Sequence, residues 1–472
     1  MVAAAISTTA KPVELVVADP HDSAALQREK FLPVTRAALV DRLTAASAWP
    51  RGDVAQVRRF LRYVDYWRRH SYTMRLLDLE QSYEPFSPDS DLFVTRQYSE
   101  LERREMQARV VAGVHQLVAQ ANYKIVPRDK VATTILSKES HYGLDLKVDF
   151  DAFEELLVCY RGESTTKVKR RNLKHFFRKE EFAVPIFRRM LVLFKLKPIE
   201  RHVGDVRRHL ELSQEDAEKQ VRRSRAHIPE QIKPENIYIK IFKNIPKSDV
   251  EMVFPNTEVK FRTKDKLWLG VTGSGALGAG VVGAAGKLAL AFSNPVTAAG
   301  AVGGLGMVMF RQVMNFMNQK QRYMQVLAQN LYFHAMADNR GAMTKLADRA
   351  AEEDFKEEIL LYSVLAKEPV RRSELHEVDE AIQTYIERTF GLQVDFELED
   401  ALGRLITDGL VSEGPDGVLT TLQPVAAAAH IDEMWDQILD MLPHTSELAG
   451  HEIDRGPGAA MPPHLNGAAG KA

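Results

Sequence analysis

The chain has 472 residues, a formal net charge of −1 at pH 7 and a single cysteine. This length is typical of two to four domains, and the balanced charge argues against bulk attraction to nucleic acid. One cysteine excludes an internal disulfide and any metal site built from several cysteines. Because Cys159 lies within the apolar run 156–160, we expect it to be a buried core residue.

The N-terminal part of the chain predicts a flexible lead followed by helices. Residues 1–20 lack an early basic cluster, and charged residues interrupt their apolar ones, which is not typical of a signal peptide. Further on, apolar side chains recur at helical spacing, for example at Val57, Phe60 and Val64. We therefore expect a helical region over residues 21–143.

Strand patterns begin near residue 144 and predict a small α+β unit over residues 144–265. Apolar and polar residues alternate at 144–150, 237–242 and 258–262. Between these strands lies a basic insert, residues 161–225, in which Lys and Arg outnumber Asp and Glu by about two to one.

The basic insert is open to three interpretations. Its charges form a solvated face, bind nucleic acid, or contact anionic lipid head groups, which attract each nearby Lys or Arg by about 1 kcal/mol. No nucleic-acid recognition motif accompanies the charges, so no nucleic-acid partner is expected. The candidate lipid-contact residues are the most closely spaced ones, Lys167, Lys169, Arg170, Arg171 and Lys174.

A Gly- and Ala-rich stretch, residues 266–317, predicts a transmembrane helical hairpin. No Asp or Glu occurs over residues 267–337, although 27% of the whole chain is charged, and ionised carboxylates are costly in lipid. Residues 267–292 are long enough to cross a hydrocarbon core of about 30 Å as a helix. A turn that contains a proline follows at 293–295, and the return segment is shorter.

Small residues recur four apart within this hairpin, a spacing that lets two helices approach closely in lipid. The candidate packing residues are Gly275, Ala279, Gly283, Ala299 and Gly303. Two other interpretations of the stretch stay open. The pattern at 273–278 matches a dinucleotide-binding turn but lacks the carboxylate expected about 20 residues on. Alternatively, a hairpin of weakly apolar residues lies buried within a soluble fold.

Residues 318–441 predict a helical and winged-helix-like module. His334 and Asp338 are four residues apart on an expected helix, where a surface hydrogen bond is a simpler interpretation than catalysis. Acidic residues at 352–358 open a further helix, and they suit its dipole better than they suit a metal cluster. Two helices and a glycine-turned hairpin follow at 373–421. Because the second of these helices is acidic, we expect packing or protein interaction there rather than DNA binding.

The predicted fold class is mixed and mainly α, with an N-terminal helical region, a small α+β unit, a Gly/Ala-rich transmembrane helical hairpin and a C-terminal winged-helix-like module. Residues 442–472 are rich in Pro, Gly and Ala, which predicts a disordered tail. Basic residues flank the hairpin, whereas its turn is uncharged. Both soluble parts are therefore expected on the cytoplasmic or matrix side.

Several short motifs together resemble one family. They are Pro85-Phe86-Ser87-Pro88-Asp89, Ala121-Asn122-Tyr123, Tyr160-Arg161-Gly162, the run from Tyr238 to Pro246, and Leu331-Tyr332-Phe333 with Asp338-Asn339. Their order around a membrane hairpin resembles the uncharacterised two-span membrane protein family that includes animal transmembrane protein 143 and plant and bacterial homologues. The resemblance implies two membrane spans and leaves biochemical activity open.

No catalytic, phosphate-loop or metal-ligand motif occurs in the chain, so we expect no cofactor and no metal. The leading hypothesis is a non-enzymatic, membrane-anchored scaffold or adaptor, multi-pass in a bacterial cytoplasmic or organellar inner membrane. Its expected partners are the lipid bilayer, anionic lipid head groups, and an unknown protein or a second copy of itself. The alternatives are an oligomeric glycine-zipper pore or transport element, and a membrane enzyme without a recognisable motif.

Overall fold

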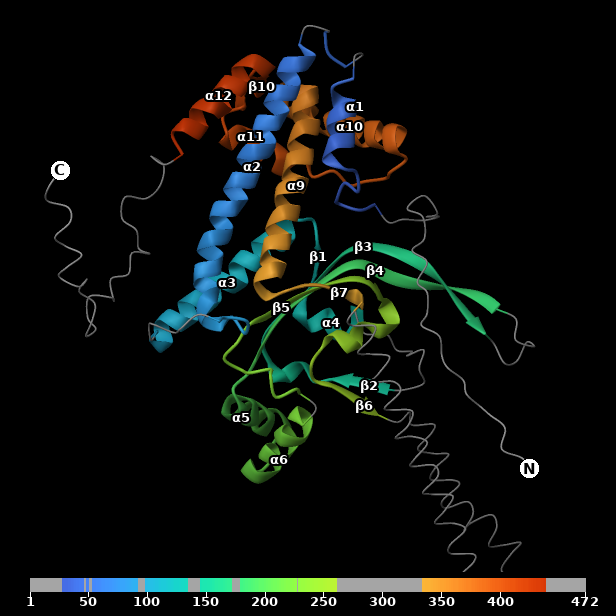
Figure 1. Cartoon of the computed structure of the whole chain (residues 1–472), viewed down its shortest axis with the longest axis vertical. Coiled ribbons are helices and arrows are strands. Elements are labelled where there is room, and N and C mark those ends of the chain that lie inside the picture. The colour runs from blue at the N-terminus through green and yellow to red at the C-terminus, as the bar shows by residue number, and fades with distance from the viewer. Residues whose placement is uncertain are drawn as a thin grey trace, which may run out of the picture.

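The computed structural model describes residues 28–45, 48–50, 53–91, 98–134, 145–171, 179–226, 228–260 and 333–438. At its centre lies a five-stranded antiparallel sheet in the order β1-β3-β4-β5-β7 (Figure 1). The strands are β1 (Lys124–Val126), β3 (Phe153–Arg171), β4 (Lys179–Leu196), β5 (Tyr238–Pro246) and β7 (Ala335–Asp338). Because β1 and β7 lie outside residues 144–265, the sheet joins parts of the chain that are far apart in sequence.

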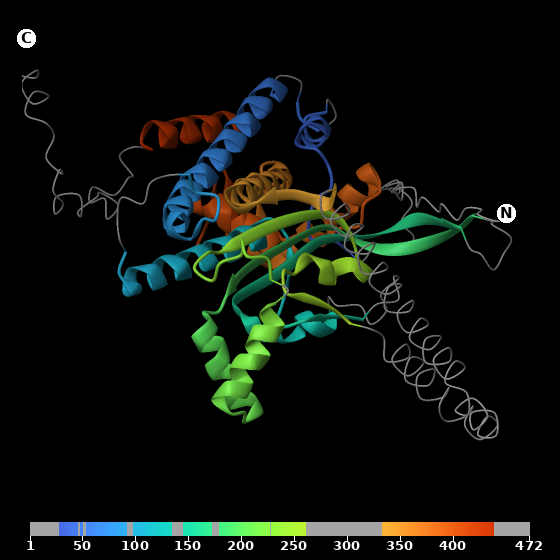
Figure 2. The ribbon, with the colours of Figure 1, turned by 60° about the horizontal axis from the view of Figure 1, so that its bottom comes forward.

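Both faces of the sheet are covered. On one face lie α2 (Val54–Tyr83), α3 (Glu100–Gln120) and α9 (Asn339–Leu365), and on the other lie α5 (Ile199–Leu210), α6 (Gln214–Arg225), β2 (Asp145–Val148) and β6 (Thr257–Lys260) (Figure 2). In β4, Leu191 and Leu193 pack towards the helices of the first face, whereas Val192 and Phe194 pack on the second. A strand buried on both faces needs a continuous apolar run, which residues 190–194 supply.

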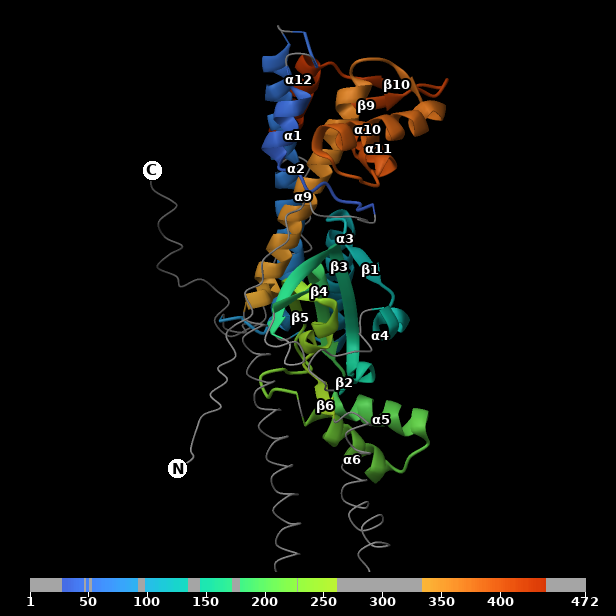
Figure 3. The same cartoon turned by 90° about the vertical axis from the view of Figure 1, so that its right-hand side faces the viewer.

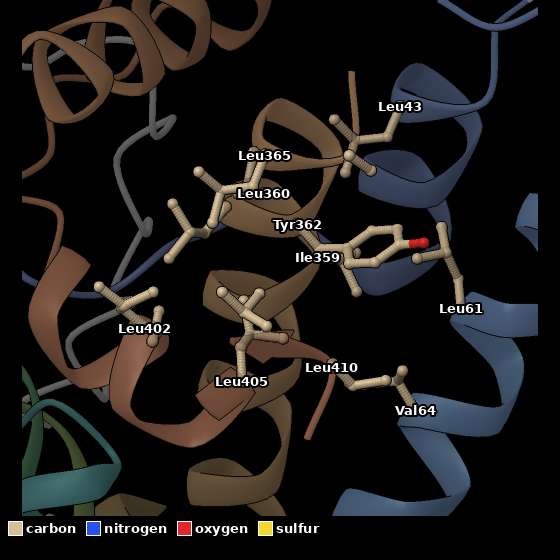
Figure 4. Packing of buried hydrophobic residues seen from close by; sticks show 14 of the residues in the cluster. Leu43, Leu61, Val64, Ile359, Leu360, Tyr362, Leu365, Leu402, Leu405 and Leu410 are labelled. Carbon is tan, nitrogen blue, oxygen red and sulfur yellow. The ribbon is translucent and has the colours of Figure 1, made fainter. Parts of the chain in front are cut away.

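Beyond the sheet, α2 and α9 run side by side into a second core (Figure 3). Its other elements are α1 (Arg36–Leu43), α10 (Leu375–Phe390), α11 (Leu398–Thr407), α12 (Pro424–Asp436) and a three-stranded sheet of β8 (Val370–Arg371), β10 (Val418–Thr421) and β9 (Val411–Glu413). Figure 4 shows side chains of α2, α9 and α11 meeting in this core, among them Leu61, Tyr362 and Leu405. The short helix α4 (Val131–Thr134) follows β1.

Local signals set where several helices begin and end. Ser99 caps α3 and forms a capping box with Glu102, which satisfies two backbone donors of the first turn. Gly391 ends α10 with φ 68°, a left-handed conformation that a residue without Cβ adopts at no steric cost. These ends follow from neighbours in sequence and need no tertiary contact.

The predicted basic insert contains long strands as well as the helices α5 and α6. Residues 161–171 continue β3 and residues 179–196 form β4, which are strands of 19 and 18 residues. They stay paired in register beyond the sheet, with Lys169 opposite Glu181, and form a two-stranded arm (Figure 1). Because the backbone pairing of its two strands holds this arm together, the sequence pattern alone does not reveal it as strand.

The predicted fold class is wrong. The described chain is an α+β fold built around the central sheet, and in these ranges no helix is both long and apolar enough to cross a membrane. α2 and α9 are long, but both carry many charged residues. The hairpin predicted for residues 266–317 lies outside the described residues, so no transmembrane or glycine-zipper hairpin forms part of the described fold.

Candidate functional site

A cavity of about 430 Å³ lies between the sheet and α9, beside the segment 31–35. Its size is within the range of small-molecule sites, roughly 300 to 1,000 Å³. Its walls come from β3, β4, β5, β7 and α9, which meet near the middle of the molecule (Figure 1). Among the described residues that line it are six cations and one carboxylate, namely Arg161, Arg188, Arg189, Lys345, Arg349, Lys356 and Glu352.

The strand wall of the cavity consists of Arg161 from β3 with Arg188 and Arg189 from β4. Arg161 and Arg189 are direct cross-strand partners, so their side chains lie on the same face. Next to Arg161 in β3, Gly162 has φ 74°, and a Cβ there would lie 3.2 Å from Arg188 Cβ and 3.3 Å from Phe31 Cζ. Consecutive strand residues normally point to opposite faces. The irregular backbone at this glycine leaves room for both β4 arginines to line one cavity.

The helix wall is a single stripe along α9. Lys345, Arg349, Glu352 and Lys356 follow one another at intervals of four, three and four residues. Residues at these intervals lie on the same side of an α-helix. The stripe therefore brings three cations of the helix to the same cavity as the arginines of the strand wall.

Three of the six cations have carboxylate partners. Arg161 donates to Glu353 at 2.8 Å, and Lys356 lies 3.1 Å from the same carboxylate. Glu352 lies 2.6 Å from Arg349 and 3.0 Å from Lys356. Burial alone would raise the pKa of Glu352, but the charges of Lys356 and Arg349 lower it below its ordinary value. This carboxylate is therefore ionised and paired at neutral pH.

The other three cations, Arg188, Arg189 and Lys345, have no carboxylate partner in the part of the chain that the structure describes. Arg189 Nη1 donates instead to the backbone oxygen of Arg188 at 2.7 Å. Burial lowers the pKa of Arg189, and the positive charges of the neighbouring arginines lower it further. Because arginine stays protonated despite such a shift, the lowered pKa marks a place where positive charge is poorly compensated.

An N-terminal strap, residues 28–35, forms one side of the cavity and is bound to α9 through its backbone. Leu32 N donates to Glu353 at 2.9 Å, and Lys356 Nζ donates to Leu32 O at 2.9 Å. All three residues are buried. Because Glu353 also accepts from Arg161, one buried carboxylate joins the strap, the helix and the strand wall.

One turn further along α9, a carboxylate cluster meets arginines from two other helices. Arg404 of α11 lies 3.3 Å from Asp354, 2.6 Å from Glu357 and 2.8 Å from Glu358. Arg68 of α2 also pairs with Glu358, at 3.0 Å. The prediction that these acidic residues open a helix is wrong, because α9 begins at Asn339 and has no acidic residue in its first turn. Their charge is balanced by buried arginines rather than by a helix dipole.

Burial governs the protonation of this cluster. Desolvation raises the pKa of Asp354, that of Glu357 to about 8 and that of Glu358 to about 7, against the lowering effect of the arginines. Tyr72 donates a hydrogen bond to Asp354 at 2.6 Å. Among the described residues, no group of three or more His, Cys, Asp or Glu is arranged to hold a metal ion. The cluster is a network of ion pairs and hydrogen bonds that joins α2, α9 and α11.

The residues predicted to contact lipid lie mostly on the arm. Lys167, Lys169, Arg170 and Arg171 belong to β3, whose backbone pairs in register with β4. Lys174 lies outside the described residues, as do the five predicted packing residues, Gly275, Ala279, Gly283, Ala299 and Gly303. Lipid contact and helix packing at these positions stay predictions.

His334 and Asp338 do not form the helical pair expected from their spacing. Residues 335–338 form β7, which pairs with β5 at the edge of the sheet. His334 Nδ1 lies 2.7 Å from the backbone oxygen of Lys243, and Asp338 forms an ion pair with Lys240 at 3.1 Å. Pairing with β5 replaces the helix, so the two side chains bind separate partners on that strand.

Sequence reasoning missed the cavity, although two signals point to it. Arg188 and Arg189 interrupt the apolar run of β4, and charged residues inside such a run are seldom buried without a role. The charged stripe on α9 keeps helical spacing over residues 345–356. Three motifs of the family resemblance also reach the cavity, through Tyr123, Arg161 and Asn244.

The fold and the cavity together define an α+β protein with an antiparallel sheet and a cavity lined mainly by basic residues. Residues 153–341 match the model of a family described as a protein of unknown function (DUF3754). The match covers less than half of the chain and includes the strand-wall arginines, whereas the α9 stripe lies just beyond it. No solved structure matches the chain. The resemblance to the two-span membrane family stays a prediction.

Proposed function

We propose that the protein binds a small anionic ligand through a phosphate group held in the basic cavity. The observation that carries this proposal is that Arg188, Arg189 and Lys345 converge on one cavity and have no carboxylate partner among the described residues. Positive charge that is partly removed from water and lacks a partner is costly. An anion in the cavity would supply the missing negative charge.

Phosphate suits this arrangement better than carboxylate. A phosphate monoester carries about −1.5 to −2 charges at neutral pH and offers three strong acceptor oxygens. The planar guanidinium groups of Arg188 and Arg189 match phosphate geometry, and Lys345 adds a compact point charge from the other wall. A carboxylate carries a single charge and would leave most of the cations uncompensated.

The proposed activity is binding rather than catalysis. Glu352, the carboxylate among the described lining residues, is held by Arg349 and Lys356, and its lowered pKa makes it a poor base. Desolvation raises the pKa of Tyr123, which keeps this hydroxyl protonated. The described cavity therefore offers donors for an anion rather than groups that exchange protons with it.

A ligand-binding cavity is compatible with the scaffold or adaptor role expected from the sequence, which stays a prediction. α9 lines the cavity with side chains over residues 345–356 and packs in the second core with its last turns. In such a role the ligand would stabilise the junction between the sheet and the C-terminal helices, and those helices would provide the surface for a protein partner.

Isothermal titration calorimetry of the full chain with inorganic diphosphate at low salt tests the proposed function. We expect saturable binding at one site, weakened about tenfold or more by Arg189→Gln, because a hydrogen bond to a charged group contributes roughly 1.5–3 kcal/mol. Since Arg189 has no carboxylate partner among the described residues, its replacement should leave the melting temperature unchanged or higher.

Lys219→Gln is the charge-matched control for this experiment. Lys219 is an exposed cation of α6, on the other face of the sheet, so its replacement should leave diphosphate affinity unchanged. Equal affinity of Arg189→Gln and the control, or no saturable binding to the wild type, would contradict the cavity as a phosphate site.

A further inference from the structure

The charge around the cavity exceeds what one phosphate group can neutralise. The described lining residues carry six positive charges and one negative charge, and buried Glu353 adds a second negative charge beside Arg161. These groups leave a net formal charge of +4. One phosphate monoester supplies about −1.5 to −2, so two phosphate groups are needed to match the balance.

The unpaired cations also lie on different walls. Arg188 and Arg189 belong to β4, whereas Lys345 belongs to the first half of α9 and is followed one turn later by Arg349. Arg349 and Lys356 pair with the same carboxylate, that of Glu352, so part of the positive charge on the helix wall is not neutralised. A single phosphate group bound at the arginines of β4 would leave the cations of the helix wall to be neutralised separately.

Apolar side chains beside the cations indicate that the ligand has an uncharged body. Pro33 and Val34 of the N-terminal strap and Met336 of β7 line the cavity, and none of the three is fully buried. A cavity of about 430 Å³ with apolar as well as charged lining is typical of a site for an organic molecule rather than for a bare inorganic ion.

We infer that the ligand is an organic molecule with two phosphate groups, one held by Arg188 and Arg189 and the other by Lys345 and Arg349. This inference rests on the proposed function and specifies the class of ligand. The same chemistry occurs in soluble polyol bisphosphates and in the head groups of phosphorylated inositol lipids. The cavity recognises the pair of phosphate groups in either source.

Calorimetry with inositol monophosphate and inositol bisphosphate at equal ionic strength tests the inference. We expect the bisphosphate to bind at least about tenfold more tightly, because it adds charge-assisted hydrogen bonds on the second wall. Lys345→Gln should remove most of that advantage, because it weakens bisphosphate binding much more than monophosphate binding. Lys345 is partly exposed and unpaired among the described residues, so this variant should fold normally. Lys219→Gln should keep the full advantage.

Vesicles distinguish the two sources of the ligand. Sedimentation of the protein with vesicles that contain phosphatidylinositol bisphosphate, reversed by soluble inositol bisphosphate, would support the inference and assign a lipid head group. Binding of the soluble compound alone would support it and assign a soluble ligand. Equal affinities for the monophosphate and the bisphosphate would overturn the inference and leave the proposed function standing. If inorganic diphosphate also failed to bind, both the inference and the proposed function would be overturned.

Discussion

Arg404 shows how one side chain can hold two parts of the molecule together. It extends from α11 and reaches the carboxylates of Asp354, Glu357 and Glu358 on α9. Its own side chain is 18% exposed, and those of its partners are at most 5% exposed. Removing one member of a buried ion pair leaves an uncompensated charge, which costs far more than breaking an exposed pair.

We predict that Arg404→Met lowers the free energy of unfolding by about 3 kcal/mol or more, because three buried carboxylates lose their common partner. Urea denaturation measures the loss. Arg372→Met is the matched control, since Arg372 also pairs with two carboxylates, Glu399 and Glu413, but its side chain is 46% exposed. The control should cost less than about 1 kcal/mol. If both variants lost the same free energy of unfolding, burial of the ion pairs would not explain the effect of Arg404→Met.

At the scale of elements, α9 is the helix on which both cores and the cavity depend. Leu346 in its first half packs against the sheet, and Leu360 in its second half packs in the second core. The charged stripe at 345–356 faces the cavity, and the carboxylates at 353–358 face the arginines of α2 and α11. A helix with core on several sides cannot be recognised from a simple two-sided pattern.

The strand β3 contains a cysteine whose reactivity reports whether the central sheet is folded. Cys159, the only cysteine of the chain, lies opposite Leu191 of β4 and is fully buried, as expected from its apolar neighbours. Desolvation raises the pKa of its thiol well above the ordinary value, so the reactive thiolate is almost absent.

We predict that a thiol reagent labels Cys159 only when the sheet opens. The labelling rate in increasing urea should follow the unfolding transition observed by circular dichroism, and protein unfolded in urea should react at once. Ala substitution at Cys159 gives the blank for the assay. Rapid labelling of the folded protein without urea would contradict the buried position of β3.

Strand prediction succeeded where the pattern was local and failed where pairing decided it. β5 lies where alternation at 237–242 indicates a strand. β7 has four residues and was expected to be helical, because its strand form depends on hydrogen bonds to β5 rather than on its own composition. The arm formed by β3 and β4 was missed because the pairing of the two strands with each other holds it together.

At the scale of the whole molecule, buried carboxylates make stability fall as pH rises. In the folded protein the pKa of Glu357 is about 8 and that of Glu358 about 7, above the ordinary value of 4.5. At a pH between 4.5 and the raised pKa, the folded state therefore binds more protons than the unfolded state. For each extra proton bound, the free energy of unfolding falls by up to about 1.4 kcal/mol when the pH rises by one unit. The contribution is complete below a pH of about 4.5 and is lost as the pH rises to about 8.

We predict that the urea midpoint of the wild type falls between a pH of about 7 and about 9, and that Glu357→Gln makes this decrease smaller. The glutamine keeps an acceptor for Asn122, which donates to Glu357 at 2.8 Å, but it does not titrate. Glu377→Gln, at an exposed position of α10, is the control and should follow the wild type. If the urea midpoint of Glu357→Gln fell as steeply with pH as that of Glu377→Gln, the pKa of Glu357 would not be raised.

The sequence by itself determined the features that depend on near neighbours. These are the burial of Cys159, the strand at 237–242 and the helix ends at Ser99 and Gly391. Each follows from local composition, from alternation or from a capping residue, because the energy of such features is set within a few residues of the chain.

Only the tertiary structure decided what the charges do. Arg161 meets Glu353 across 192 residues, and Leu32 meets the same carboxylate across 321. A charged residue looks the same in sequence whether it faces water, a partner or a cavity, since its energy depends on burial and on groups brought near by folding. Arg188, Arg189 and Lys345 became a candidate phosphate site because the described fold brings them together and provides no carboxylate to pair with them.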